Sequence, residues 1–266
     1  MIPEKINCPI ILECSGLSKS FGGVMAVHGI DLVIREGELV GLIGPNGSGK
    51  STLFNLITGM IQADNGQVLF KGTDITNFSA DRRTKLGIAR TFQNIRLFSS
   101  LNVLTNVMIG MHRELEGTFW SSIFRTSTAR MREASIRRLT DELLNFVGLT
   151  GKENELAGAL SYGEQKRLEL ARALAISPSV LLLDEPAAGM NRSEAQNLMA
   201  LLQKLNKRGL TIFIVEHNME VIMNISEKII VMNSGEKLLE GTPAQIQKDP
   251  RVIEVYLGKD TMEVGA

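Results

Sequence analysis

An α/β fold with a mostly parallel sheet is predicted by three features of the sequence. Short apolar runs typical of strands alternate along the chain with segments of helical periodicity. A glycine-rich turn, GPNGSGKST, follows one such strand and leads into a helix. Between residues 102 and 176 strand signals are sparse and helical periods dominate. Alternating strands and helices favour a parallel sheet, and the intervening stretch predicts a helical insert within it.

The predicted elements follow this pattern along the chain. Strands are expected at residues 10–14, 30–34, 38–44, 67–72, 180–186, 211–217, 228–235 and 236–241. Helices are expected at residues 51–60, 103–112, 129–149, 164–176, 193–209 and 219–226. The tail TPAQIQKDPRVIEVYLG predicts two short helices split by Pro250, because proline cannot continue a helix.

Composition is that of an ordinary globular chain of one or two domains. Hydrophobic residues make up 44% and charged residues 22%, and 29 basic side chains balance 29 acidic ones. This balance lacks the basic bias of a general nucleic-acid-binding protein. Cys8 and Cys14 are too few for a disulfide framework or a zinc site and favour a reducing compartment. We expect neither a signal peptide nor a membrane span.

The strongest motif is the turn after the third predicted strand. Gly44, Gly49, Lys50 and Ser51 satisfy G-x-x-x-x-G-K-[ST] between a strand and a helix. Glycines let consecutive N–H groups curl around phosphate, while the lysine reaches the β- and γ-phosphates and the serine joins Mg²⁺. The alternative is a glycine-rich turn with a solvent-facing lysine. The predicted nucleotide-binding residues here are Gly44, Pro45, Asn46, Gly47, Ser48, Gly49, Lys50, Ser51 and Thr52.

Two acidic residues close the apolar run VLLLDEP. Asp184 is expected to hold Mg²⁺ through water. Glu185 is a candidate base or orienting group for an attacking water, which predicts hydrolysis rather than transfer to a bound acceptor. The alternative is an acidic pair that merely ends a strand before a turn.

Three further residues are informative only as a set. Gln93, in RTFQN, has an amide that can both ligate Mg²⁺ and hold a water. His217, in IVEHN, ends a strand at the edge where ligands of open α/β sheets collect. Phe21, in KSFGG, could stack on adenine. Taken singly, each is explained as well by a surface glutamine, a structural histidine or an aromatic that fills a local pocket.

The stretch LSYGEQKRLELARALA predicts a helix start with an unusual glycine. Ser161 can cap the helix, and Glu164 completes a capping box. Gly163 in the first turn costs roughly 1 kcal/mol relative to alanine. Close approach of another molecule would justify the bare backbone, and helix N-termini attract phosphates.

In this order, GPNGSGKS, TFQN, LSYGEQ, VLLLDEP and IVEH resemble the nucleotide-binding subunit of an ABC transporter over nearly the whole chain. The resemblance implies a P-loop ATPase core with a mostly parallel sheet, an N-terminal antiparallel β region, a helical subdomain, and ATP and Mg²⁺ as cofactors. It places one ATPase domain at about 10–258, with its core at about 10–92 and 178–240, the helical subdomain at about 93–177 and C-terminal helices at about 243–258.

The resemblance also implies roles for individual residues. Two ATPase subunits pair head to tail, so that Ser161, Gly163 and Gln165 face the γ-phosphate held by the partner. The implied residues of the chain's own pocket are Phe21 for adenine stacking, Glu185, His217 and Gln93 for catalysis, and Ser51, Gln93 and Asp184 for Mg²⁺.

Two positions depart from the family pattern. Tyr162 and Gly163 stand where the family usually has two glycines. Asn191, in PAAGMN, stands where aspartate is common, which puts a charge-based contact between subunits in doubt. An amide can still hydrogen-bond there.

Narrower likenesses point to one subfamily. RTFQNIRLFSSLNVLTNVMIG, EPAAGMN, VIEVYLG and the long segment between His112 and Arg138 resemble the ATPase subunits of branched-chain or hydrophobic amino-acid importers. Trp120 and Phe124 in that segment are expected to pack within the helical insert. The implied function is ATP hydrolysis that couples closure of the paired subunits to amino-acid uptake.

The implied partners are a second ATPase subunit, identical or a sister chain, two transmembrane permease subunits and an extracytoplasmic substrate-binding protein. No nucleic acid is expected, and the implied location is the cytoplasmic face of the membrane. The segment from Gln93 to about Met111 is expected to offer a groove to a short permease helix.

Two rival functions share parts of this pattern. A soluble ABC-type ATPase acting on DNA or ribosomes usually carries a second cassette or a long coiled-coil insert. A small-molecule kinase would need an acceptor pocket and would have no use for LSYGEQ.

Overall fold

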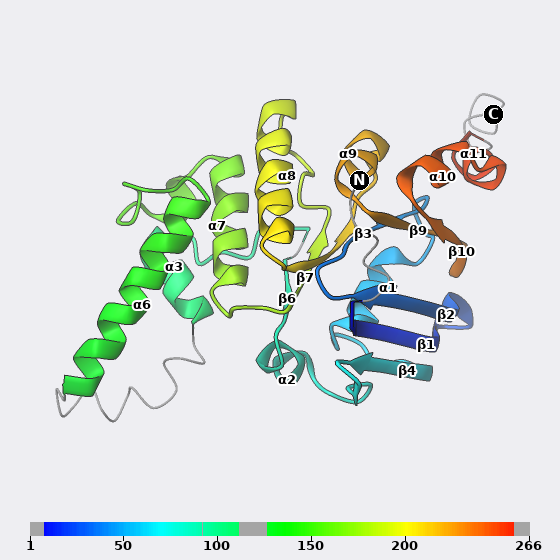
Figure 1. Cartoon of the computed structure of the whole chain (residues 1–266), viewed down its shortest axis with the longest axis horizontal. Helices are drawn as coiled ribbons and strands as arrows, with labels where there is room; N and C mark the ends of the chain where they lie inside the picture. Colours follow the sequence, from blue (N-terminus) through cyan, green and yellow to red (C-terminus); the bar gives the residue numbers. More distant parts are fainter. Residues whose placement is uncertain (1–7, 92, 112–126, 258–266) are drawn as a thin grey trace.

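The computed structural model describes residues 8–91, 93–111 and 127–257, and it contains two β-sheets with helices around them (Figure 1). A four-stranded sheet has the order β2-β1-β4-β5, and a six-stranded sheet has the order β10-β9-β3-β8-β7-β6. The predicted α/β class with a mostly parallel sheet and an N-terminal antiparallel region is confirmed. The segment that contains Trp120 and Phe124 lies outside the described residues.

The smaller sheet is antiparallel and comes from the first quarter of the chain. Its strands are β1 (Ile10–Phe21), β2 (Val24–Arg35), β4 (Asn65–Phe70) and β5 (Thr73–Asp74). Gly22 and Gly23 have φ of 53° and 86°, as a two-residue hairpin turn of this type requires. β1 and β2 run longer than the sequence predicts, because register shifts within them interrupt the alternation of apolar and polar residues.

The larger sheet carries the site. Its strands are β3 (Leu39–Ile43), β6 (Ile88–Arg90), β7 (Val180–Asp184), β8 (Thr211–Val215), β9 (Lys228–Asn233) and β10 (Glu236–Gly241). All pairs are parallel except β9 with β10. Every residue of β3, β7 and β8 is buried, as their unbroken apolar runs predict. The carboxyl ends of these strands therefore meet at one edge.

Alternate residues of the parallel strands enter two separate cores. On β8, Phe213 and Val215 pack with the antiparallel sheet and α1 (Lys50–Ile57). Ile212 and Ile214 pack on the opposite face with the other helices. Those helices include α8 (Arg192–Lys207), α9 (Met219–Ile225), α10 (Pro243–Lys248) and α11 (Pro250–Leu257). Pro250 begins α11, so the predicted split of the tail into two helices is confirmed.

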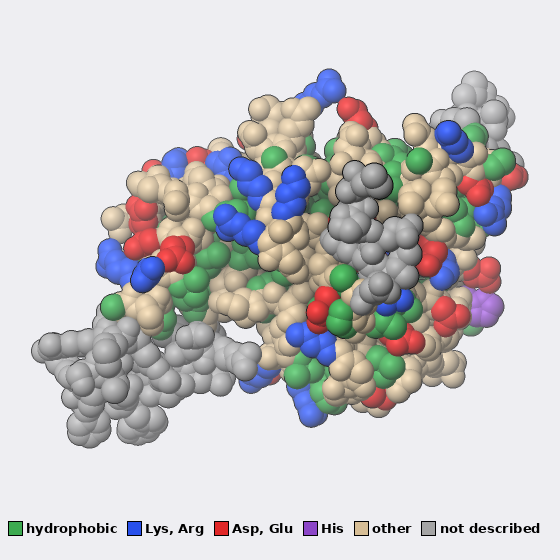
Figure 2. All heavy atoms as spheres, in the orientation of Figure 1, with side chains coloured by type: hydrophobic (Ala, Val, Ile, Leu, Met, Phe, Trp, Pro, Cys, Tyr) green, Lys and Arg blue, Asp and Glu red, His purple; other side chains and the backbone are tan. Residues whose placement is uncertain are grey.

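A group of helices lies beyond the β6 end of the parallel sheet (Figure 1). It contains α3 (Val103–Gly110), α6 (Ser127–Phe146), the short 3-10 helix η2 (Ala157–Ala159) and α7 (Tyr162–Leu174). The helical insert predicted between the phosphate loop and VLLLDEP is thus present. None of the helices in the described ranges is long and apolar enough to span a membrane. On the face drawn in Figure 2, acidic and basic side chains are interspersed, with basic ones gathered near α8.

A buried arginine joins α1 to the unpredicted short helix α2 (Ala80–Lys85). The Arg83 side chain is 2% exposed and donates to four backbone carbonyl groups. Two of them, Leu56 and Ile57, lie at the end of α1, where carbonyl groups lack helical partners. Arg83 therefore closes the C-terminal end of the helix that the phosphate loop begins.

Replacing Arg83 with Met should lower the free energy of unfolding by about 3 kcal/mol or more, because several buried carbonyl groups would lose a charged donor. Urea denaturation of the full chain measures the change. The neighbouring Arg82→Met is the control, since Arg82 is exposed and only stacks on Phe78. Equal midpoints for Arg83→Met and wild type would contradict the anchoring role.

Candidate functional site

The glycine-rich turn connects β3 to α1 and is shaped by close packing at two glycines. A Cβ at Gly44 would lie 2.3 Å from the Met232 carbonyl oxygen, and one at Gly49 would lie 2.3 Å from that of Ala26. At Gly47, with φ of 79°, no atom lies within 4 Å of the Cβ position. The backbone is therefore tightly packed at Gly44 and Gly49 and open at Gly47, which suits backbone contact with a phosphate.

The lysine of this loop points inward. Its ammonium donates to the carbonyl oxygens of Gly44 at 2.7 Å and Pro45 at 2.9 Å, and the residue is 7% exposed. The alternative of a solvent-facing lysine is therefore wrong. Of the remaining loop residues, Ser48 is buried, Thr52 is half-buried, and Asn46 and Ser51 are exposed.

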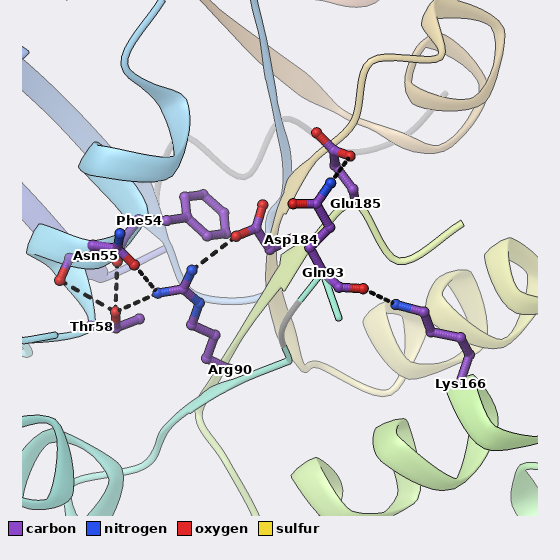
Figure 3. Close-up of polar contacts among 8 residues, drawn as sticks. All are labelled: Phe54, Asn55, Thr58, Arg90, Gln93, Lys166, Asp184 and Glu185. Carbon is purple, nitrogen blue, oxygen red and sulfur yellow. Dashed lines mark hydrogen bonds and ion pairs between the residues drawn. The ribbon is translucent and has the colours of Figure 1, made fainter. Parts of the chain in front are cut away.

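Asp184 ends β7 and is paired with an arginine that the sequence analysis missed. Its Oδ2 accepts from Arg90 Nη2 at 2.8 Å, and both side chains are about nine-tenths buried. Arg90 Nη1 also donates to Asn55 Oδ1 and Thr58 Oγ1 on α1 (Figure 3). Arg90 is the last residue of the edge strand β6, three positions before Gln93, and that placement is the signal that could have revealed it.

Glu185 is the point where three strand ends converge. Gln93 Nε2 donates to its Oε2 at 3.0 Å (Figure 3), and His217 Nδ1 lies 3.6 Å from the same oxygen. The backbone at Glu185 is left-handed, with φ of 46°, and its N–H donates to the Val215 carbonyl group at 3.0 Å. The structure therefore brings together the three residues that the sequence predicts to be catalytic.

A second residue that the sequence did not reveal, the buried acid Glu216, is close to this group. Glu216 is 1% exposed, and its Oε1 accepts from the Ala187 N–H at 3.0 Å. Burial raises the pKa of this carboxyl group, opposed by the Ala187 hydrogen bond. Glu216 thus ties the loop after β7 to the end of β8, and its position beside His217 in IVEH was the available signal.

The LSYGEQ segment begins α7 as predicted. Ser161 caps the helix, and Glu164 accepts from the Ser161 N–H at 3.0 Å to complete the capping box. Gln165 Nε2 donates back to the Leu160 carbonyl group at 2.9 Å. Ser161 itself is exposed, and its hydroxyl group donates to Glu164 Oε2 at 3.0 Å at the helix start.

A side chain of the same chain lies close to Gly163. A Cβ there would lie 2.6 Å from Oε1 of Glu194 in the first turn of α8. Asn191 caps α8, accepting from the Glu194 N–H at 2.9 Å. The asparagine in place of the family's aspartate therefore serves as a helix cap, and the Glu194 carboxylate is the group nearest to the Cβ position at Gly163 in the described part of the chain. Contact of Gly163 with a partner's nucleotide stays a prediction.

Phe21 ends β1 beside the hairpin turn, and its side chain is 49% exposed. The Lys19 ammonium lies 5.6 Å from the centre of the ring. An exposed aromatic next to two glycines leaves a flat surface open, so stacking on adenine stays a prediction.

The donor groups near the loop fit Mg²⁺. Ser51, Gln93 and Asp184 offer hydroxyl, amide and carboxylate oxygens, the ligands that this ion prefers. No group of three or more His, Cys, Asp or Glu side chains suited to a metal occurs in the described part of the chain. Nucleotide-bound Mg²⁺ does not need one, because phosphates and waters complete its shell.

Known proteins with similar sequence and structure place the chain in a family. The family described as ABC transporter matches residues 27–188, and one described as branched-chain amino acid ATP-binding cassette transporter matches residues 236–261. The high-affinity branched-chain amino acid transport ATP-binding protein BraF of Pseudomonas aeruginosa is 42% identical over 250 residues, which cover 94% of this chain and 98% of BraF. LivG of Escherichia coli, named for the same transport, is 38% identical with the same coverage.

Solved structures of ATP-binding cassettes are also similar to this chain. A crystal structure of the ADP conformation of MJ1267, an ATP-binding cassette of an ABC transporter, matches with a TM-score of 0.81 and 33% identity, covering 94% of this chain and 99% of that one. The ATP-binding cassette MJ0796, solved as a dimer bound to ADP and Pi, matches with a TM-score of 0.73 and 30% identity, covering 88% of this chain and 99% of that one. The chain therefore belongs to the family of ATP-binding subunits of ABC transporters, in the branch whose relatives are named for branched-chain amino acid transport.

Proposed function

We propose that this chain hydrolyses ATP as one of two paired cassettes and couples closure of the pair to uptake of amino acids, with branched-chain amino acids as the cargo. The observation that carries the proposal is the convergence of Gln93, Glu185 and His217 beside the phosphate loop. The proposed complex contains two transmembrane permease subunits and an extracytoplasmic binding protein, with this chain on the cytoplasmic face of the membrane.

The chemistry follows from the positions of the side chains. Glu185 Oε2 accepts from the Gln93 amide and is 3.6 Å from His217. A carboxylate held in this way can orient a water molecule and accept its proton. The Lys50 ammonium, inside the loop, supplies positive charge where phosphate oxygens would lie.

Mg²⁺ held by Ser51 and Gln93, with Asp184 acting through water, would polarise the phosphates and neutralise their charge. Arg90 holds the Asp184 carboxylate through a hydrogen bond of 2.8 Å.

The second half of the pocket would come from the partner. Ser161 caps an exposed helix start, whose N–H groups and dipole favour negative charge. We assign Ser161, Gly163 and Gln165 to the γ-phosphate held by the opposite subunit. The dimer of the related cassette MJ0796 supports this pairing.

A groove of about 610 Å³ lies between α2, β6, α3 and α7 and suits a short helix of the permease. Phe98, which is 49% exposed, and Met60, which is 47% exposed, supply apolar surface. Arg172, Asp81 and Lys85 add charges to its lining. An amphipathic helix binds such a surface through its apolar face, and the charges fix its orientation.

Glu185→Gln should lower ATP hydrolysis at least about 100-fold, because the amide cannot accept the proton of the attacking water. ATP should then hold the variant as a dimer, since the step that separates the subunits is blocked. Phosphate release and size-exclusion chromatography measure the two effects. Glu220→Gln, at an exposed acid on α9, is the control. A Glu185→Gln protein that hydrolyses ATP at the wild-type rate and stays monomeric would refute the proposal.

Phe98→Asp should abolish retention of the chain on membranes that contain its permeases, because a charge would replace the apolar surface of the groove. Sedimentation of washed membranes from the native organism, followed by immunoblotting, provides the measurement. Ile253→Asp is matched to it, since Ile253 is 45% exposed and lies on α11, away from the groove. Equal retention of both variants would argue against docking at this groove.

A further inference from the structure

A lysine on α7 reaches the backbone of Gln93. Lys166 Nζ donates to the Gln93 carbonyl oxygen at 2.7 Å, and the Gln93 amide donates to Glu185 Oε2 at 3.0 Å (Figure 3). Gln93 thus links α7 to Glu185, the acid on which the proposed chemistry depends. The link runs through the backbone of Gln93 on one side and through its side chain on the other.

A second contact from the same face of α7 reaches the same segment. Glu169 lies one turn after Lys166, and its Oε1 accepts from the Arg96 N–H at 3.4 Å. Residues three apart on a helix share a face, so Lys166 and Glu169 together hold residues 93–96 against α7. Movement of α7 relative to the sheet must therefore move this segment or break both contacts.

The environment of Lys166 is costly for a lysine. The residue is 4% exposed, and burial lowers the pKa of its ammonium group. The carboxylates of Glu169, Glu216, Asp184 and Glu185 act in the opposite direction. A buried ammonium group is maintained only where hydrogen bonds and opposite charges compensate for lost water, so its geometry here is tightly specified.

The start of α7 is rigidly connected to this lysine. Ser161 and Lys166 lie within the first turns of one helix, about 7.5 Å apart along its axis. The capping box fixes that end of the helix, and the Tyr162 ring centre lies 5.8 Å from the Lys166 ammonium. A displacement at Ser161 is therefore transmitted to Lys166 with little loss.

We propose that Lys166 is a positioning residue that transmits the position of α7 to Gln93, and through the Gln93 amide to the carboxylate of Glu185 in the same chain. This inference rests on the proposed function, in which the start of α7 contacts the nucleotide of the partner. Lys166 then makes the geometry of one composite pocket depend on occupancy of the other. The consequence is cooperative hydrolysis by the pair.

Steady-state ATP hydrolysis by the full chain, measured against ATP concentration, tests this role. Lys166→Met removes the donor at similar side-chain length, and Lys166→Arg keeps a cationic donor. We expect Lys166→Met to lower kcat about tenfold, the loss typical of one charge-assisted hydrogen bond. The Hill coefficient should fall from above 1 in wild type to about 1, and binding of a fluorescent ATP analogue should change less than about twofold. Lys166→Arg should restore both kcat and cooperativity.

The matched control is Lys228→Met. Lys228 also donates to a backbone carbonyl group, that of Val33 at 2.6 Å, but it joins β9 to β2. The Lys228→Met variant should retain wild-type cooperativity. If Lys166→Met is too unstable to purify, Lys166→Gln, whose amide is too short to reach Gln93, replaces it in the same comparison.

Two results would overturn the inference: wild-type kcat and Hill coefficient in Lys166→Met, or equal losses in Lys166→Met and Lys228→Met with no rescue by Lys166→Arg. Failure of the proposed function is recognised separately. In that case Glu185→Gln would hydrolyse ATP at the wild-type rate and would stay monomeric with ATP.

Discussion

The left-handed backbone at Glu185 is the constraint on which the site depends. A non-glycine residue in this conformation costs about 1 to 3 kcal/mol, and here the hydrogen bond from its N–H to Val215 helps to hold it. The turn separates two adjacent acids. Asp184 faces Arg90 and α1, whereas Glu185 faces Gln93 (Figure 3). His217 also lies 3.6 Å from the Glu185 carboxylate. Neighbouring residues can therefore serve different functions in the same pocket.

Two buried cations, Arg90 and Lys166, offset the cost of placing the acidic side chains of the site next to the two apolar cores. Removing an ion pair from water is costly unless further hydrogen bonds satisfy both partners. Arg90, which is paired with Asp184, meets this condition through Asn55 and Thr58, whereas the buried Lys166 ammonium donates to the Gln93 carbonyl oxygen. Arg90 belongs to β6, and Lys166 contacts Gln93 in the segment that follows β6. The edge strand and the segment after it thus connect the C-terminal end of α1, the acids and the helical region, and the strand also borders the groove proposed for the permease.

The sequence predicted those features that are local. Unbroken apolar runs identified β3, β7 and β8, and the spacing of Gly44, Gly49 and Lys50 identified the loop. The sequence underestimates the length of β1 and β2, because register shifts interrupt the alternation of apolar and polar residues. The six residues of α2 are too few to show a helical period. The sequence alone did not single out Arg90 and Lys166 as parts of the site, because the residues that they contact are distant in sequence. Gly163 suggested a ligand, while the nearest group is Glu194, 31 positions away in the same chain.

A crystal structure of the Glu185→Gln chain with ATP and Mg²⁺ would test most directly whether the strand ends of one subunit and the α7 start of another form a single pocket. The account predicts a dimer in which residue 185, Gln93 and His217 of one subunit and Ser161 of the other lie within hydrogen-bonding reach of the γ-phosphate or its water. A nucleotide held by the Lys50 loop alone, with Ser161 facing solvent, would contradict it.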